Sequence, residues 1–167
     1  MAERVIETDR LSLRPLAPDD VDLVHRFWTD PDVRRYLWDD EVIDRDRAAA
    51  VVAESVASFA RRGFGHWAMH LRERGAFVGW CGLRDAGDDV ELLYAVVPDA
   101  WGRGLATEAA RALVSYGFDA CRLDRVVAAT DAPNVASARV LAKAGFVRTP
   151  DAGGLLRFVV LRTAGQT

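Results

Sequence analysis

The sequence predicts an α/β fold in which helices cover both faces of a mixed, mostly antiparallel sheet, and two repeated patterns support it. An apolar, β-branched run at Val90–Val97 is followed by a glycine-rich turn and by apolar residues at helical spacing over Leu105–Phe118. A second strand pattern, Arg125–Thr130, is followed by a helical pattern that begins at Asn134. Strands and helices that alternate in this way are typical of a sheet covered by helices.

The other elements follow from alternation, helical periodicity and turn residues. The first part of the chain is expected to hold a strand at 10–16, a helix from Pro18 to about Trp28, a short helix at 32–37, a loop at 38–40 and a helix at 44–61 ended by Gly63. An antiparallel hairpin of strands 66–71 and 76–83 comes next, and strands 146–149 and 155–161, joined by a turn at 153–154, come last.

Length and composition limit the organisation of the chain. With 167 residues, of which 50% are hydrophobic, the chain is long enough to bury one core. We expect a single domain over 1–167 with its core at 8–161. No apolar run is long enough to cross a membrane, and the N-terminus lacks the apolar stretch of a signal peptide, so we expect a cytoplasmic protein without a membrane partner.

The charge pattern argues against a nucleic-acid scaffold. The formal net charge is −3, and the acidic residues concentrate in the first half of the chain. Solvated surface is the ordinary explanation for such residues, and an acidic rim that attracts a cationic amine is the functional one. We expect no direct nucleic-acid partner.

The thiols and imidazoles do not predict a metal site. Cys81 and Cys121 lie in apolar surroundings without metal-ligand spacing, which favours two buried reduced thiols over a disulfide or a nucleophile. His25, His66 and His70 have no carboxylate or cysteine partners at ligand spacing. We expect no metal.

The turn before Leu105 is suited to binding an anion. Two glycines and Ala106 remove side chains from the start of the helix, so that unpaired backbone N–H groups can contact a phosphate at the positive end of the helix dipole. A P-loop would need a lysine before Ser or Thr, and Lys143 is the only lysine. A dinucleotide loop would need a third glycine where Thr107 stands. Close packing of the glycines is the remaining structural explanation.

Three segments together resemble the GNAT superfamily of N-acetyltransferases. Trp101-Gly102-Arg103-Gly104-Leu105-Ala106 is similar to the loop that binds the pyrophosphate of acyl-CoA, with Trp in place of the usual Gln or Arg. The segment Asn134–Phe146 resembles the family's Asn-x-x-Ser-x-x-x-Leu-x-Lys-x-Gly-Phe pattern, and Thr8–Leu16 resembles an opening strand. The Trp-Gly setting is similar to the branch that acetylates ribosomal-protein N-terminal alanines.

The resemblance implies a GNAT-like sheet with a splayed central strand pair and acetyl-CoA as co-substrate. In such a sheet the pantetheine arm enters the gap between the central strand and the strand after the glycine-loop helix, and a backbone N–H polarises the acetyl carbonyl. The residues expected to bind the cofactor are Tyr94, Ala95, Val96, Val97, Gly102, Arg103, Gly104, Leu105, Ala106, Thr107, Asn134 and Arg139.

Two residues are the candidates for catalysis. Glu91, a carboxylate in an otherwise apolar strand, matches the family's position for a general base, and it could instead lie exposed or pair with an arginine. Ser137 is the candidate acid for the leaving CoA thiolate, and it could instead bond back to its own helical turn. We expect direct attack by the amine in a ternary complex.

The acceptor is an amine, and a protein N-terminus or a small molecule both fit the motifs. Aromatic residues expected to line its cleft are Trp38, Tyr36, Trp28 and Trp80, with Trp38 the strongest candidate and packing in the core the ordinary explanation for any one of them. Two alternatives stay open: an acyl-CoA sensor without turnover, and an enzyme that uses a longer donor such as succinyl-CoA. The sequence is compatible with a monomer or a homodimer.

Overall fold

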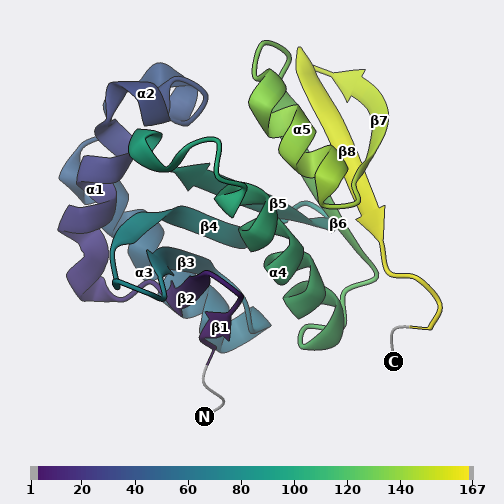
Figure 1. Cartoon of the computed structure of the whole chain (residues 1–167), viewed down its shortest axis with the longest axis horizontal. Helices are drawn as coiled ribbons and strands as arrows, with labels where there is room; N and C mark the ends of the chain where they lie inside the picture. Colours follow the sequence, from purple (N-terminus) through teal and green to yellow (C-terminus); the bar gives the residue numbers. More distant parts are fainter. Residues whose placement is uncertain (1–3, 166–167) are drawn as a thin grey trace.

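An eight-stranded sheet forms the centre of the computed structural model, which describes residues 4–165 (Figure 1). The strands are β1 (Ile6–Glu7), β2 (Leu11–Pro15), β3 (His66–Leu71), β4 (Phe77–Ala86), β5 (Asp89–Val96), β6 (Arg125–Asp131), β7 (Val147–Ala152) and β8 (Leu155–Leu161). Their order in the sheet is β1-β2-β3-β4-β5-β6-β8-β7. Neighbours are antiparallel except β5 and β6, so the predicted mixed, mostly antiparallel sheet is confirmed.

The α-helices lie between the strands along the chain. They are α1 (Val21–Thr29), α2 (Pro31–Arg34), α3 (Arg45–Arg62), α4 (Leu105–Asp119) and α5 (Val135–Lys143). Local sequence signals mark the ends of α3: the side chain of Asp44 caps it by accepting from the N–H of Arg47 at 2.7 Å, and Gly63 ends the helix in the left-handed conformation. None of the helices within residues 4–165 combines the length and apolarity needed to cross a membrane.

Two clusters of buried side chains hold the helices to opposite faces of the sheet. One cluster joins α4 to the sheet through residues such as Leu113, Leu92 and Trp67. The other joins α1 and the first half of α3 to the sheet through residues such as Trp28 and Trp80. Figure 1 shows α4 and α5 on the near face, with α3 behind the sheet. Helices on both faces were predicted, and the two clusters explain why each face needs its cover.

Some strands and helices begin or end at other residues than predicted. In the strands, hydrogen-bonded pairing with a neighbouring strand sets these ends, and the local sequence pattern does not show it. Strand β1 was not predicted, because two residues are too few to show alternation. Strand β4 continues to Ala86 because it stays paired with β5 as far as Asp89. Helix α2 begins at Pro31 and ends at Arg34, and the predicted loop at 38–40 is a short left-handed turn.

The parallel pair β5–β6 diverges along its length. Glu91 and Val127 are the registered partners between these strands, whereas β4 and β5 are in register along β5 from Asp89 to Val96. Past Glu91, therefore, the edge of β5 that faces β6 has no registered strand partner among residues 4–165. The splayed central pair that the resemblance implied is present.

Candidate active site

The glycine loop opens α4 with backbone rather than with side chains. Gly102 and Gly104 have φ of 74° and 77°, a region that favours glycine, and Gly104 is the N-cap of α4 without a side-chain cap. The first N–H that bonds back into the helix is that of Glu108, to the carbonyl of Gly104 at 3.1 Å. The N–H groups between these residues have no partner within the helix. Gly102 and Gly104 are exposed and Ala106 is half-buried, so the loop is accessible to an anion.

Trp101, which departs from the family's usual Gln or Arg, fastens the loop to the central strand. Its indole Nε1 donates to the carbonyl of Val96 at 2.8 Å, while its ring remains 55% exposed. Behind the loop, Leu105 is 1% exposed and Thr107 is 9% exposed. The side chain of Leu105 therefore anchors the loop in the core, and its backbone N–H is the part that can face a ligand.

Tyr94 and Ser137 meet across the splayed part of the sheet. The hydroxyl of Tyr94 lies 2.7 Å from the Ser137 hydroxyl and donates to the Ser137 carbonyl at 3.1 Å. Burial raises the pKa of Tyr94 to about 12, against a smaller opposite effect of the Ser137 bond. Asn134 caps α5 as predicted: its Oδ1 accepts from the N–H of Ser137 at 3.2 Å. Arg139 is exposed on the same helix.

Glu91 is paired with an arginine, one of the alternatives that the sequence left open. Arg84 lies opposite Glu91 on β4, and its Nε and Nη2 both donate to Oε2 of Glu91, at 2.8 and 2.7 Å. The Glu91 side chain is 16% exposed, whereas Arg84 is 56% exposed. Oε1 of Glu91 has no donor among the described residues. The pair fixes the carboxylate while leaving one oxygen for another partner.

Three of the four predicted acceptor-side aromatic residues form a continuous cluster. Trp28 packs edge-on against Trp38 and Trp80, with ring centroids 5.6 and 5.5 Å apart. Trp28 and Trp80 are buried in the core, Trp38 is half-buried, and Tyr36 is 41% exposed. The structure therefore brings three of the four together and leaves Tyr36 on the surface. The buried Nε1 atoms of Trp28 and Trp38 have no hydrogen-bond partner among the described residues.

His66 belongs to this cluster, and the sequence analysis gave it no role. Its ring stacks on Trp80 at 5.4 Å, and its Nδ1 accepts from Trp80 Nε1 at 3.1 Å. Burial, with a smaller contribution from Arg84, lowers the pKa of His66 to about 4. Gly82 faces this ring, since a Cβ there would lie 2.3 Å from Nδ1. His66 is therefore a neutral hydrogen-bond acceptor at neutral pH.

Cys81 lies opposite Tyr94 in the β4–β5 pair, and Cys121 follows the end of α4. Both cysteines are free; Cys81 is buried and Cys121 is half-buried. Burial raises the pKa of both thiols, which disfavours their reactive thiolate forms. Within residues 4–165, no group of three His, Cys, Asp or Glu side chains has the arrangement of a metal site.

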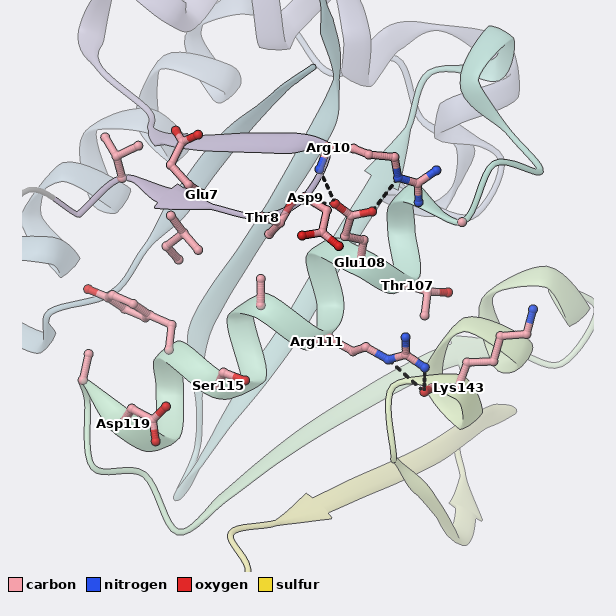
Figure 2. A pocket seen from close by; sticks show the side chains of 16 residues that line it. Glu7, Thr8, Asp9, Arg10, Thr107, Glu108, Arg111, Ser115, Asp119 and Lys143 are labelled. Atoms are coloured by element: carbon pink, nitrogen blue, oxygen red, sulfur yellow. Dashed lines mark hydrogen bonds and ion pairs between the residues drawn. The ribbon is translucent and has the colours of Figure 1, made fainter. Parts of the chain in front are cut away.

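A groove of about 1020 Å³ runs from the glycine loop along α4 (Figure 2). The segment from Val5 to Arg10 forms one wall, and Thr107, Arg111 and Lys143 lie at its other side. Arg111 donates to the carbonyl of Lys143 at 2.8 Å and so joins α4 to the end of α5. Figure 2 also shows Arg10 and Glu108 in contact beside the loop. These two residues are 98 positions apart, so no local pattern in the sequence indicated their contact.

Comparison with known protein families identifies the family of this chain. A sequence profile described as "Acetyltransferase (GNAT) domain" matches residues 10–147. The chain belongs to the GNAT acetyltransferase family. Members of this family use acetyl-CoA as co-substrate, and the exposed backbone N–H groups of the glycine loop fit its diphosphate chemically.

Several relatives found by sequence are acetyltransferases by name. The "Uncharacterized N-acetyltransferase YoaA" of Bacillus subtilis is 28% identical over 145 residues, which cover 85% of this chain and 82% of the relative. The "FsC-acetyl coenzyme A-N(2)-transacetylase" of Aspergillus fumigatus is 31% identical over 160 residues, which cover 86% of this chain and 65% of the relative. This GNAT protein is therefore an acetyl-CoA-dependent acyltransferase that acts on an amine.

Solved structures agree with this assignment. An acetyltransferase from Agrobacterium tumefaciens is 26% identical with a TM-score of 0.84, covering 95% of this chain and 94% of the other. RimL, described as a ribosomal L7/L12 α-N-protein acetyltransferase in complex with coenzyme A, is 14% identical with a TM-score of 0.79, covering 94% and 96%. The RimL similarity shows the fold alone. The GNAT resemblance is thus confirmed, and the ribosomal-protein branch stays a prediction.

Proposed function

We propose that this protein transfers the acetyl group of acetyl-CoA to a primary amine by direct attack in a ternary complex. The proposal depends on one observation: the exposed glycine loop and the unpaired edge of β5 follow one another along the chain and can contact one extended ligand. The exposed glycine loop at α4 provides free N–H groups for the diphosphate, and β5, which leads into that loop, has a free edge for the pantetheine arm. One extended molecule with a diphosphate at one end and amides along its length matches both.

The loop contributes through its backbone from Gly102 to Thr107, with Arg103 adding an exposed positive charge. Along β5, the backbone from Tyr94 to Val97 would pair with the pantetheine amides. Asn134 keeps its cap role at α5, and Arg139 lies on the same helix for the nucleotide phosphate. These residues hold and orient the donor, and a backbone N–H of β5 polarises the acetyl carbonyl.

The amine must lose a proton before it attacks, and Glu91 is placed to accept one. An α-amino group has a reference pKa of about 8 and a lysine side chain one of about 10.4, so the first is easier to neutralise. Oε2 of Glu91 is held by Arg84, which leaves Oε1 to accept the proton directly or through a water. This geometry supports Glu91 as the general base of the proposed reaction.

Ser137 and Tyr94 act together on the leaving thiolate. Tyr94 has one proton, and when it turns from the Ser137 carbonyl to the Ser137 hydroxyl, the proton of Ser137 is free to point at the sulfur. Tyr94 has a pKa of about 12. A free thiol has a reference pKa of about 8.5, so the phenol keeps its proton and contributes a hydrogen bond rather than a full transfer. The pair thus stabilises negative charge on the sulfur.

The acceptor is either a protein N-terminal α-amine, as the ribosomal-protein branch would imply, or a small-molecule amine. The left-handed segment Trp38–Asp40 and Tyr36 are the acceptor-side features nearest the surface, and Trp28 and Trp80 support Trp38 from behind. Trp38 is therefore the aromatic residue we expect an acceptor to meet first.

The test combines an amine screen with a variant of the proposed base. Acetyl-CoA is supplied with peptides starting in Ala or Ser, amino acids and polyamines, and free thiol is measured. Glu91→Gln should lower kcat by about 100-fold or more, most strongly at low pH, with the Kd for acetyl-CoA unchanged. Glu54→Gln, which removes an exposed carboxylate on α3 paired with Arg61, is the control and should be silent.

Saturable CoA binding without thiol release from any amine would contradict the proposal and indicate a sensor. Thiol release with succinyl-CoA but not with acetyl-CoA would contradict the donor. A rate of Glu91→Gln equal to that of the unmodified protein at every pH would remove Glu91 from the role of base.

A further inference from the structure

An ion pair beside the glycine loop connects the N-terminal segment to α4 (Figure 2). We call Thr8, Arg10 and Glu108 the N-terminal latch. Oε1 of Glu108 accepts from the Thr8 hydroxyl at 2.6 Å and from the N–H of Arg10 at 2.8 Å. Oε2 of Glu108 accepts from Nε of Arg10 at 2.7 Å. Both oxygens of this carboxylate are therefore used within the latch.

Arg10 also reaches the loop itself. Its Nη1 donates to the carbonyl of Arg103 at 2.7 Å. A trans peptide places the carbonyl of one residue and the N–H of the next on opposite sides, so this bond turns the N–H of Gly104 away from Arg10. The Nη2 atom of Arg10 lies 3.4 Å from where a Cβ of Gly104 would be. One guanidinium thus sets the orientation of the peptide that enters α4.

The charge of Glu108 makes this arrangement necessary. Glu108 lies in the first turn of α4, where a diphosphate would bind, and its side chain is 18% exposed. Burial acts to raise the pKa of Glu108, but the bonds from Thr8 and Arg10 outweigh it and hold the pKa below its ordinary value. The carboxylate is therefore charged at neutral pH. Without a cation beside it, it would repel the phosphates.

We propose that Arg10 is a positioning residue for the CoA diphosphate: it neutralises Glu108 and fixes the Arg103–Gly104 peptide. Arg10 lies outside the helix, in the turn between β1 and β2. Donor binding therefore depends on the N-terminal segment. This inference rests on the proposed use of acetyl-CoA at the loop. It assigns a function to two residues that the sequence analysis did not identify.

If Arg10 acts by neutralising Glu108, the two single variants should differ in their Kd for acetyl-CoA, and the double variant should recover part of the lost affinity. Arg10→Gln should raise the Kd and KM for acetyl-CoA by about 20-fold at low salt, with kcat at saturation within about twofold of the unmodified protein. Glu108→Gln keeps the acceptor oxygen and removes the repulsive charge, so its Kd should change by less than about threefold. In the double variant the Kd should return to within about fivefold of the unmodified protein.

A neighbouring arginine provides the matched control. Arg72 holds the same N-terminal segment, through Glu7 at 2.9 Å and the Thr8 carbonyl at 2.7 Å, without contacting the loop. Arg72→Gln should cost similar thermal stability and leave the Kd for acetyl-CoA unchanged. Arg10→Lys keeps the charge and checks folding, and its Kd should lie between those of Arg10→Gln and the unmodified protein.

Two results would overturn the inference. An equal loss of affinity in Arg10→Gln and Arg72→Gln would mean that anchoring the segment is all that matters. A double variant no better than Arg10→Gln would remove the charge argument. If the unmodified protein takes up no acetyl-CoA, the proposed function itself has failed, and that outcome is distinct from either of these.

Discussion

The donor side and the acceptor side of this sheet are built in different ways. On the donor side, the glycine loop presents backbone N–H groups and the neighbouring polar side chains are paired: Glu108 with Arg10, and Tyr94 with Ser137. On the acceptor side, Trp28 and Trp38 keep buried indole N–H groups that no described residue satisfies. There, Trp38, Asp39 and Asp40 have φ of 57°, 52° and 61°.

The two sides therefore differ in how much unfavourable free energy they contain. A left-handed non-glycine residue costs about 1–3 kcal/mol, and a buried unpaired donor about the same. The donor side avoids both costs because a common co-substrate can be recognised by backbone alone. The acceptor side has both costs in the segment around Trp38, which is the part of the site that we propose meets the amine. We therefore expect changes on the donor side to affect all acceptors equally.

The largest effect should come from closing the loop. Gly104→Val places a β-branched side chain at φ of 77° and against Arg10, and should weaken acetyl-CoA binding by roughly 1,000-fold. Gly87→Val is the matched control, because Gly87 has φ of 66° in a remote turn with open space around it. Calorimetry should show unchanged affinity in Gly87→Val, and an equal loss in both variants would contradict the assignment of the loop.

A second prediction concerns the pH dependence of stability that His66, on the acceptor side, should cause. Burial lowers the pKa of His66 from its ordinary value of 6.5 to about 4 in the folded protein, so the unfolded state binds more protons between these values. Stability should therefore fall by up to about 3 kcal/mol as the pH drops from about 6.5 to 4. His66→Gln keeps an acceptor for Trp80 and should flatten this dependence. Denaturant unfolding at several pH values measures it, and identical slopes in both proteins would refute the prediction.

The smallest effect is expected at the leaving-group pair. Tyr94→Phe removes the hydrogen bond to Ser137 and should lower kcat by about 20-fold with little change in the KM for acetyl-CoA. Tyr116→Phe is the control, since Tyr116 donates to the carbonyl of Gly63 at 2.6 Å away from the sulfur. Ser137→Ala combined with Tyr94→Phe should lose little more than either alone, and fully additive losses would show that the two hydroxyls act separately.

The sequence was most informative where a feature is local. The glycines at 102 and 104, the cap at Asn134 and the strand patterns each depend on neighbouring residues, and the structure has them as predicted. Pairings between distant segments gave no local signal. Arg10 and Glu108 are 98 positions apart, and Tyr94 and Ser137 are 43 apart. Glu91 was found from its place in an apolar strand, but its partner Arg84 follows only from the strand register.

The acceptor side shows the same limit in another form. Trp28, Trp38 and Trp80 were identified by residue type, and the sequence could not show that they pack as one cluster with His66 behind them. The left-handed conformation of Trp38 also has no signature in the sequence, because Trp ordinarily avoids it, whereas Asp39 and Asp40 are of a residue type that is enriched there. The identity of the amine is therefore a question for experiment.

The central claim is that backbone N–H groups at the start of α4 hold the diphosphate of CoA. Titration calorimetry with CoA and with pantetheine, which lacks the diphosphate, tests it directly. We expect saturable binding of one CoA per chain and binding of pantetheine weaker by about 100-fold or more, because charge-assisted bonds to the loop are lost. Equal affinity for the two ligands, or no heat with CoA, would contradict the account.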